Sequence, residues 1–177
     1  MLKADADTDI IVVEMGMRQP GDIGTLAKIA RPNYGVITGI GPSHAEFFKN
    51  VAAIARGKAQ LFQSPLPWEK TPRVAFINNG TLHADLVQTI AEKKGFLIQP
   101  FSGNGGPEVN VNLCQAVGHY FGLSPQEIER GIASYHPSAH RLAVSTHRGI
   151  TLIDDTYNAN PDAVRYALRY MQRKPGR

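Results

Sequence analysis

The sequence predicts an α/β fold, with a mostly parallel sheet flanked by helices. Short apolar runs rich in β-branched residues alternate with longer segments of helical periodicity, which is the pattern of βαβ units. The pattern changes after the glycine-rich stretch at 101–108, where two helices, a hairpin and a last helix are expected. These observations indicate one α/β domain followed by the start of a second, smaller α/β domain.

The expected elements follow one another along the chain with short connections. The first group alternates between strands at 9–15, 34–40, 73–79 and 96–101 and helices at 21–30, 50–63 and 81–94. The second group comprises helices at 109–122 and 125–134, a hairpin of residues 141–147 and 150–155, and a helix at 161–173. The strand at 9–15, DIIVVEM, is expected to be buried because most of its residues are apolar.

Two local signals set boundaries in the second half of the chain. Ser124, with Glu127 three residues later, predicts a capping box at the start of the helix at 125–134. From Arg141 onwards, roughly 36 residues remain, which are too few to bury a core of their own. We therefore expect residues 1–138 to be a truncated central domain and residues 139–177 to be the beginning of a second one.

The composition is that of an ordinary globular protein. The 177 residues carry a formal net charge of +4, with the basic residues scattered along the chain. Scattered charge favours a solvated surface, or a small anionic substrate, over a nucleic-acid interface. The single cysteine, Cys114, excludes an internal disulfide and favours a reducing compartment. We expect a cytoplasmic protein with no nucleic-acid partner and no membrane span.

Lys58 is a residue that the fold class alone does not explain. It falls in the middle of the apolar stripe of the helix at 50–63. A buried ammonium group is unfavourable unless it is paired, neutralised or modified. Either the side chain extends to solvent with its stem buried, or it turns towards a polar site, and the sequence leaves both open.

Two further residues lie near the ends of apolar strands, at the edge where open α/β sheets bind ligands. Glu14 lies near the end of the strand at 9–15, and His44 follows the strand at 34–40. If these strands are parallel neighbours, the carboxylate and the imidazole share one edge and could bind a divalent cation. Each by itself is more often a structural polar residue, but together with Lys58 they favour a site.

A further candidate cluster is IDDTYNANP, residues 153–161. Asp155 ends a strand and could bind a ribose hydroxyl. Asn158 and Asn160 lead into the final helix and are explained equally well as turn and capping residues. No G-x-x-x-x-G-K-[ST] pattern occurs in the 177 residues, so the sequence contains no phosphate loop of that kind.

The motifs, taken in order, resemble the Mur ligases of peptidoglycan synthesis. The segments that carry the resemblance are VVEMGM and PGDI within 12–23, RPNYGVITGIGPSHAEFF at 31–48, IARGKAQLF at 54–62, NLCQAVGHYFGLSPQEIERGI at 112–132 and HRLAVSTHRGITLIDDTYNANPDAV at 140–164. They extend through most of the chain in the family's order. Two patterns, RPxxxVITxIGxxH and DDxYNANP, look like family signatures.

The resemblance implies an ATP-dependent amide ligase of cell-wall biogenesis. In such an enzyme a substrate carboxylate takes the γ-phosphoryl group of ATP, and an amine then attacks the acyl phosphate, with magnesium neutralising the phosphate charge. The motifs look most like the branch that joins D-alanyl-D-alanine to UDP-N-acetylmuramoyl-tripeptide. These two molecules are therefore the implied partners, and ATP and magnesium the implied cofactors.

By position, the resemblance also implies a role for each candidate residue. Glu14 and His44 would be magnesium ligands, and Lys58, catalytic together with His44, would be carbamylated into a carboxylate-like third ligand. Asn112 would lie against the adenine, Arg141 would reach the ATP phosphates, and Asp155 would hold the ribose. Asn158 and Asn160 would shape the same nucleotide edge.

The chain departs from the family pattern at several positions. Gly39 replaces the usual asparagine after Val-Ile-Thr, and Arg18-Gln19 replaces an expected Asn-His pair. Without a phosphate loop, we expect the chain not to ligate substrates by itself. The alternatives are a non-catalytic remnant or binding module of the same fold, and a sister amide ligase such as a folylpolyglutamate synthase.

Overall fold

The computed structural model describes residues 5, 7–42, 46–63, 72–103, 105–136, 138, 140–157 and 161–173. Within these residues, strands β1 (Tyr34–Ile37), β2 (Val74–Asn78) and β3 (Leu97–Phe101) form a parallel sheet in that order. Strands β4 (Ala143–His147) and β5 (Ile150–Asp154) form a separate antiparallel hairpin. The parallel sheet confirms the predicted α/β fold class.

Six α-helices in the described residues accompany the two sheets. They are α1 (Asp22–Ala30), α2 (Val51–Ala59, continued by a 3₁₀ turn over Gln60–Gln63), α3 (Ala84–Glu92), α4 (Pro107–Tyr120), α5 (Pro125–Ala133) and α6 (Pro161–Gln172). Each lies within a few residues of its predicted position. The capping box is confirmed, because the Ser124 hydroxyl accepts from the Glu127 amide and the Glu127 carboxylate accepts from the Ser124 amide. No helix among the described residues is long and apolar enough to cross a membrane.

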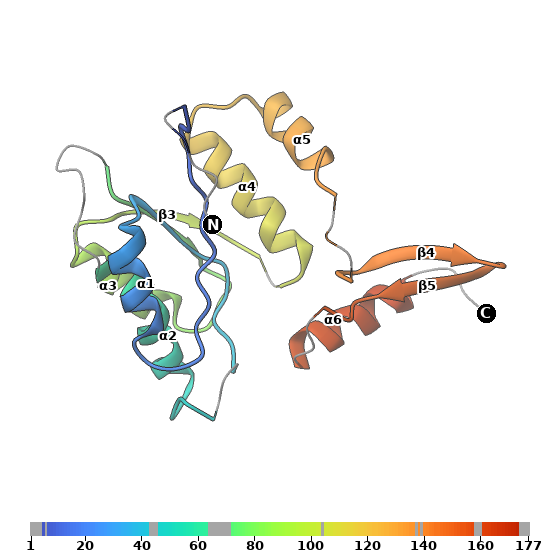
Figure 1. Cartoon of the computed structure of the whole chain (residues 1–177), viewed down its shortest axis with the longest axis horizontal. Helices are drawn as coiled ribbons and strands as arrows, with labels where there is room; N and C mark the ends of the chain where they lie inside the picture. The colour runs from blue at the N-terminus through green and yellow to red at the C-terminus, as the bar shows by residue number, and fades with distance from the viewer. Residues whose placement is uncertain are drawn as a thin grey trace.

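The parallel sheet has a separate core on each face. Strand β2 is buried along its whole length, and its alternating side chains divide between the faces. Ala75 and Ile77 belong to a cluster with residues of α1, α2 and α3, whereas Val74 and Phe76 pack with Val109 of α4. Figure 1 shows the corresponding layers, with α1, α2 and α3 on one side of the sheet and α4, accompanied by α5, on the other. Helices on both faces explain why β2 is apolar from Val74 to Ile77.

The predicted strand at 9–15 is wrong. Residues 8–17 have no regular structure, and Val12 is 91% exposed and Ile10 68% exposed. A strand is stable only when a neighbour accepts and donates its ladder hydrogen bonds. Among the described residues β1 is the edge of the sheet and pairs only with β2, so the apolar run has no strand partner. Apolar composition alone therefore did not place this segment in the sheet.

The hairpin and α6 lie beside the amino-terminal end of α4 (Figure 1). The Tyr166 ring of α6 packs against Gly106, the residue before α4, whose φ of 65° is in the left-handed region. The segment after β5 is hydrogen-bonded to the segment before β4, because the Tyr157 amide donates to the His140 carbonyl, 3.0 Å away. His140 Nδ1 also lies 2.8 Å from Asp154 Oδ2. The division at residues 138 and 139 stays a prediction.

Candidate functional site

Helix α2 places Lys58 at the carboxyl edge of the parallel sheet. The Asn50 side chain caps the helix by accepting from the Ala53 amide, 2.9 Å away. Ile54 and Ala55 are buried on the face that carries Lys58, and this face covers the sheet. The Lys58 side chain is partly buried, and its Nζ donates to the Gly39 carbonyl, 2.7 Å away, two residues beyond the end of β1.

The structure distinguishes between the two interpretations of Lys58 that the sequence left open. Its ammonium group is hydrogen-bonded at the sheet edge, and no ion pair with a described residue is recorded for it. Burial lowers the pKa of the Lys58 ammonium, because the charged form loses its hydration. Lys58 is therefore turned towards the edge of the sheet and is more easily neutralised than an exposed lysine.

The three expected magnesium ligands are not assembled among the described residues. Glu14 is exposed within the irregular segment 8–17, and His44 lies outside the described residues. No three His, Cys, Asp or Glu side chains of the described residues come close enough together to bind one metal ion. The described donor set by itself does not fit a magnesium centre, and the predicted roles of Glu14, His44 and Lys58 as ligands remain untested.

Three of the expected nucleotide-binding residues are described, and each already has a local partner. The Asn112 amide on α4 donates to the Ser102 carbonyl. The Arg141 guanidinium stacks over the Tyr157 ring at 4.0 Å, as cation–π pairs do. Asp155 is considered below, and Asn158 and Asn160 lie outside the described residues. Asn112 is polar and Arg141 is cationic, as contacts to a base and to phosphates require, whereas Asp155 is anionic; among the described residues no hydrogen bond joins Asn112 to either of the other two.

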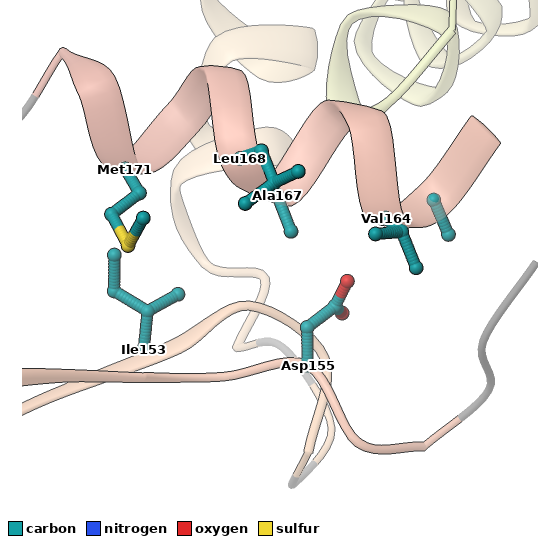
Figure 2. A pocket seen from close by; sticks show the side chains of 7 residues that line it. Ile153, Asp155, Val164, Ala167, Leu168 and Met171 are labelled. Atoms are coloured by element: carbon teal, nitrogen blue, oxygen red, sulfur yellow. The ribbon is translucent and has the colours of Figure 1, made fainter. Parts of the chain in front are cut away.

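Asp155 lies at the end of an apolar hollow between β5 and α6. Figure 2 shows its carboxylate below Val164 and Ala167, with Ile153 and Met171 towards the other end. The hollow has a volume of about 170 Å³. One carboxylate oxygen accepts from the Leu142 amide, 3.1 Å away, which leaves the second oxygen without a recorded partner among the described residues. Asp155 therefore has a structural role and retains one oxygen for a ligand.

Asn78 is an important residue at the sheet edge that the sequence analysis missed. It ends β2, and it is only 2% exposed. Its amide nitrogen donates to the carbonyls of Thr38 and Gly103, and its oxygen accepts from the amides of Gly80 and Gly103, at 2.9–3.1 Å. The signal was present in the sequence, since Asn78 is the first polar residue after the apolar run 74–77.

The same bonds explain why β1 is shorter than the predicted strand 34–40. Beyond Ile37 the backbone no longer follows the ladder with β2. The Asn78 amide bonds the Thr38 carbonyl, and the Thr81 hydroxyl bonds both the amide and the carbonyl of Ile40. Side chains thus replace the strand partner, and β1 is followed by an irregular segment that carries Gly39.

The comparison with protein families places most of the chain in one family. Residues 1–121 match the Mur ligase middle domain. The UDP-N-acetylmuramoyl-tripeptide–D-alanyl-D-alanine ligase of Mycobacterium leprae is 31% identical over 96% of this chain and 41% of its own length. The ligase of the same name from Bacillus subtilis is 26% identical over 99% of this chain and 44% of its own length. The chain thus spans less than half the length of these relatives.

Solved structures resemble the chain in fold. A crystal structure of MurF from Acinetobacter baumannii superposes with a TM-score of 0.76 at 23% identity, over 91% of this chain and 42% of that one. MurF ligase from Thermotoga maritima in complex with ADP gives a TM-score of 0.67 at 23% identity, over 90% of this chain and 43% of that one. Together with the family match over residues 1–121, these similarities show that the chain belongs to the Mur ligase family and carries its middle domain.

Proposed function

We propose that the chain is part of an ATP-dependent amide ligase that joins D-alanyl-D-alanine to UDP-N-acetylmuramoyl-tripeptide. The relatives from Mycobacterium leprae and Bacillus subtilis carry the name of that ligase. The same proposal assigns ATP and magnesium as cofactors and the two substrates as partners. It also assigns residues 1–138 to the central domain and 139–177 to the beginning of the next.

The single observation that carries the proposal is the placement of Lys58. A lysine in the apolar face of a helix is unfavourable unless its ammonium group is hydrogen-bonded, paired or neutralised. Here Nζ of Lys58 donates to the Gly39 carbonyl at the carboxyl edge of the parallel sheet. Ligands of open α/β sheets bind at that edge. The geometry therefore supports a site at the end of β1, within the segment that matches the family.

ATP would supply the phosphoryl group for activation of the substrate carboxylate when it is bound. Of this chain's own residues, Arg141 carries the fixed positive charge suited to phosphate oxygens, and Asp155 has one oxygen without a partner among the described residues, which is suited to a ribose hydroxyl. Asn112 offers an amide on α4 for the base. Asn158 and Asn160 complete the proposed nucleotide edge by their position in the sequence.

Carbamylation of Lys58 is consistent with its surroundings. The neutral amine is the form that reacts with carbon dioxide, and the lowered pKa of Lys58 increases the neutral fraction at neutral pH. A carbamate would replace the buried cation by an anion at the sheet edge. The proposal that Lys58 and His44 act together on the substrates requires His44 to approach this edge as well.

A second candidate function is a non-catalytic binding module of the same fold. The exposure of Glu14 and the lack of a three-residue metal cluster among the described residues favour it. The two candidates differ in whether the bound ligands react. They also differ in whether Lys58 is needed after the ligands have bound.

Ligand binding to the purified 177-residue chain tests the proposal, because the sequence contains no phosphate loop and turnover is not expected from the chain alone. We expect titration with ADP in the presence of magnesium to give a saturable signal. Replacing Asp155 by alanine should weaken this binding, whereas Asp85→Ala, at an exposed position of α3, should not. A correctly folded chain that binds neither ADP nor UDP-N-acetylmuramoyl-tripeptide at millimolar concentration would contradict the proposal.

Substrate binding by Lys58→Ala then separates the two candidates, because neither candidate predicts a ligated product from this chain alone. The full reaction mixture of ATP, magnesium, UDP-N-acetylmuramoyl-tripeptide and D-alanyl-D-alanine should give no ligated product with this chain alone. A product that disappears in Lys58→Ala would show that the chain is catalytic without further segments. Binding of the substrates with the same affinity in Lys58→Ala, and no product from either protein, would favour the binding module.

A further inference from the structure

The irregular segment after β1 and the turn after β2 meet at the carboxyl edge of the parallel sheet, and Asn78 joins them. The buried Asn78 amide makes four hydrogen bonds, two as donor and two as acceptor. This satisfies its full capacity and fixes the orientation of the amide, since Nδ2 faces only carbonyls and Oδ1 only amides. The segment after β1, the turn after β2 and the loop after β3 are therefore all hydrogen-bonded to one side chain.

Thr81 bonds the segment after β1 on the other side of Gly39. Its hydroxyl accepts from the Ile40 amide and donates to the Ile40 carbonyl, the latter at 3.0 Å. The Thr81 amide in turn donates to the Asn78 carbonyl at 3.3 Å. Thr38 and Ile40 are thus both held by side chains of the turn after β2, one on each side of Gly39.

Gly39 is the residue that needs this support. It has no Cβ, and a Cβ built there would meet no atom within 4 Å, so no side-chain contact at this position restricts its backbone. A glycine in such surroundings would sample many conformations. Yet its carbonyl accepts the bond from Lys58 Nζ at 2.7 Å, and that bond requires one orientation of the peptide.

We propose that Thr81 and Asn78 are positioning residues for Lys58. They fix the peptides on either side of Gly39, and the fixed Gly39 carbonyl in turn fixes the amine of Lys58. Their importance for function rests on the proposed role of Lys58 in the ligase. The positioning itself is a property of the folded chain that can be measured without any substrate.

Hydrogen exchange of the Lys58 ammonium protons, followed by NMR on the full chain, tests the proposal. Such protons give a signal only when a hydrogen bond protects them, and the signal is assigned by its loss in Lys58→Met. Thr81→Val keeps the size of the side chain and removes its hydroxyl, so we expect the Lys58 protons to exchange roughly fivefold faster, the factor that one neutral hydrogen bond corresponds to. Thr81→Ser keeps the hydroxyl and should restore the slow exchange.

Thr89→Val is the matched control. Thr89 is exposed on α3, and its replacement removes the same hydroxyl far from Gly39 in the chain, so the Lys58 signal should not change. Unchanged exchange of Lys58 in a folded Thr81→Val protein would overturn the proposal. Equal acceleration in Thr81→Val and Thr81→Ser would overturn it as well, because the hydroxyl would then not be the cause.

A measurement on the unaltered chain covers the case in which Thr81→Val does not fold. In low concentrations of denaturant, the Ile40 amide, bonded to Thr81, and the Lys58 ammonium should become exchangeable in one opening step with one free energy. Independent openings of the two groups would overturn the proposal. If ADP and the substrate do not bind but Thr81→Val releases Lys58, the proposed function fails while the positioning stands; if both bind but Lys58 is not released, the reverse holds.

Discussion

The parallel-sheet unit and the hairpin with α6 are built in different ways. The sheet unit has fully buried side chains such as Phe62 and Phe76 and a core on each face. By contrast, no described residue from Arg141 onwards whose burial is known is fully buried. The hairpin unit is held instead by polar bonds around Asp154 and Asp155 and by the contact of Tyr166 with Gly106. Candidate site residues occur in both units, so one site would combine residues of the well-packed sheet unit with residues of the less packed hairpin unit.

The largest expected effect concerns the core of the sheet unit. Phe76 is 1% exposed and lies edge-to-face with Tyr120 at 5.6 Å, so Phe76→Ala should lower the free energy of unfolding by about 3–5 kcal/mol. Leu152→Ala, at a position of β5 that is 58% exposed, should change it by less than about 0.5 kcal/mol. Urea denaturation measures both. Similar losses for the two variants would show that the hairpin unit has a core of its own.

The next effect concerns the polar centre of the sheet edge. Asn78→Ala leaves the buried amide of Gly103 and the carbonyl of Thr38 without their partner, so we expect a loss of about 2–3 kcal/mol in unfolding free energy. The control is Asn79→Ala, because Asn79 is exposed and, among the described residues, its side chain accepts a hydrogen bond from Gln88 alone. Thermal and urea unfolding should show a small change for that variant. A small change for Asn78→Ala would mean that water replaces the four bonds.

Acid should weaken the hairpin unit through Asp154. Hydrogen bonds from Thr156, and then from His140, lower the pKa of the Asp154 carboxyl below its ordinary value of 3.8. A lowered pKa in the folded chain means that the ionised form contributes stability above pH 3.8, and that this contribution is lost as the pH falls through the lower, folded value. We therefore expect the Thr156 amide, which donates to Asp154, to lose protection from hydrogen exchange in this range.

The matched variant is Asp154→Asn. It should reduce the protection of the Thr156 amide at neutral pH and remove most of its dependence on acid. The amides of β2, which are buried in the sheet unit, serve as the internal reference in the same spectra. An acid transition that persists unchanged in Asp154→Asn would assign the effect to another group.

The smallest expected effect is at Gly39. Its φ is outside the left-handed region, and a side chain would meet open space, so Gly39→Asn should change the unfolding free energy by less than about 0.5 kcal/mol. Gly106→Asn is the contrasting variant, since Gly106 has a φ of 65° and the Tyr166 ring occupies the space of a Cβ. It should detach α6 from α4, which NMR of Tyr166 would detect. Equal behaviour of the two variants would contradict the packing of Tyr166 on Gly106.

Local sequence signals predicted most of the elements, because the contacts that define a helix or a cap form between residues that are close together along the chain. The apolar periodicity of α2 and α3 and the Ser124–Glu127 capping box act within one or two turns, and all are found as expected. The prediction of a strand at 9–15 was wrong because a strand depends on residues that are distant along the chain. A strand exists only beside another strand, and composition does not say whether one is there.

For the candidate site, the sequence by itself identified Lys58 as an exception to its helix and linked Asp155 to the end of a strand. It did not decide where the Lys58 amine points, that Asp155 also holds the Leu142 amide, or that Asn78 and Thr81 fix Gly39. Each of these depends on backbone groups 13–41 residues away in the chain. Periodicity reports which face of an element is buried, but the partner of a polar group is chosen only when distant segments pack together.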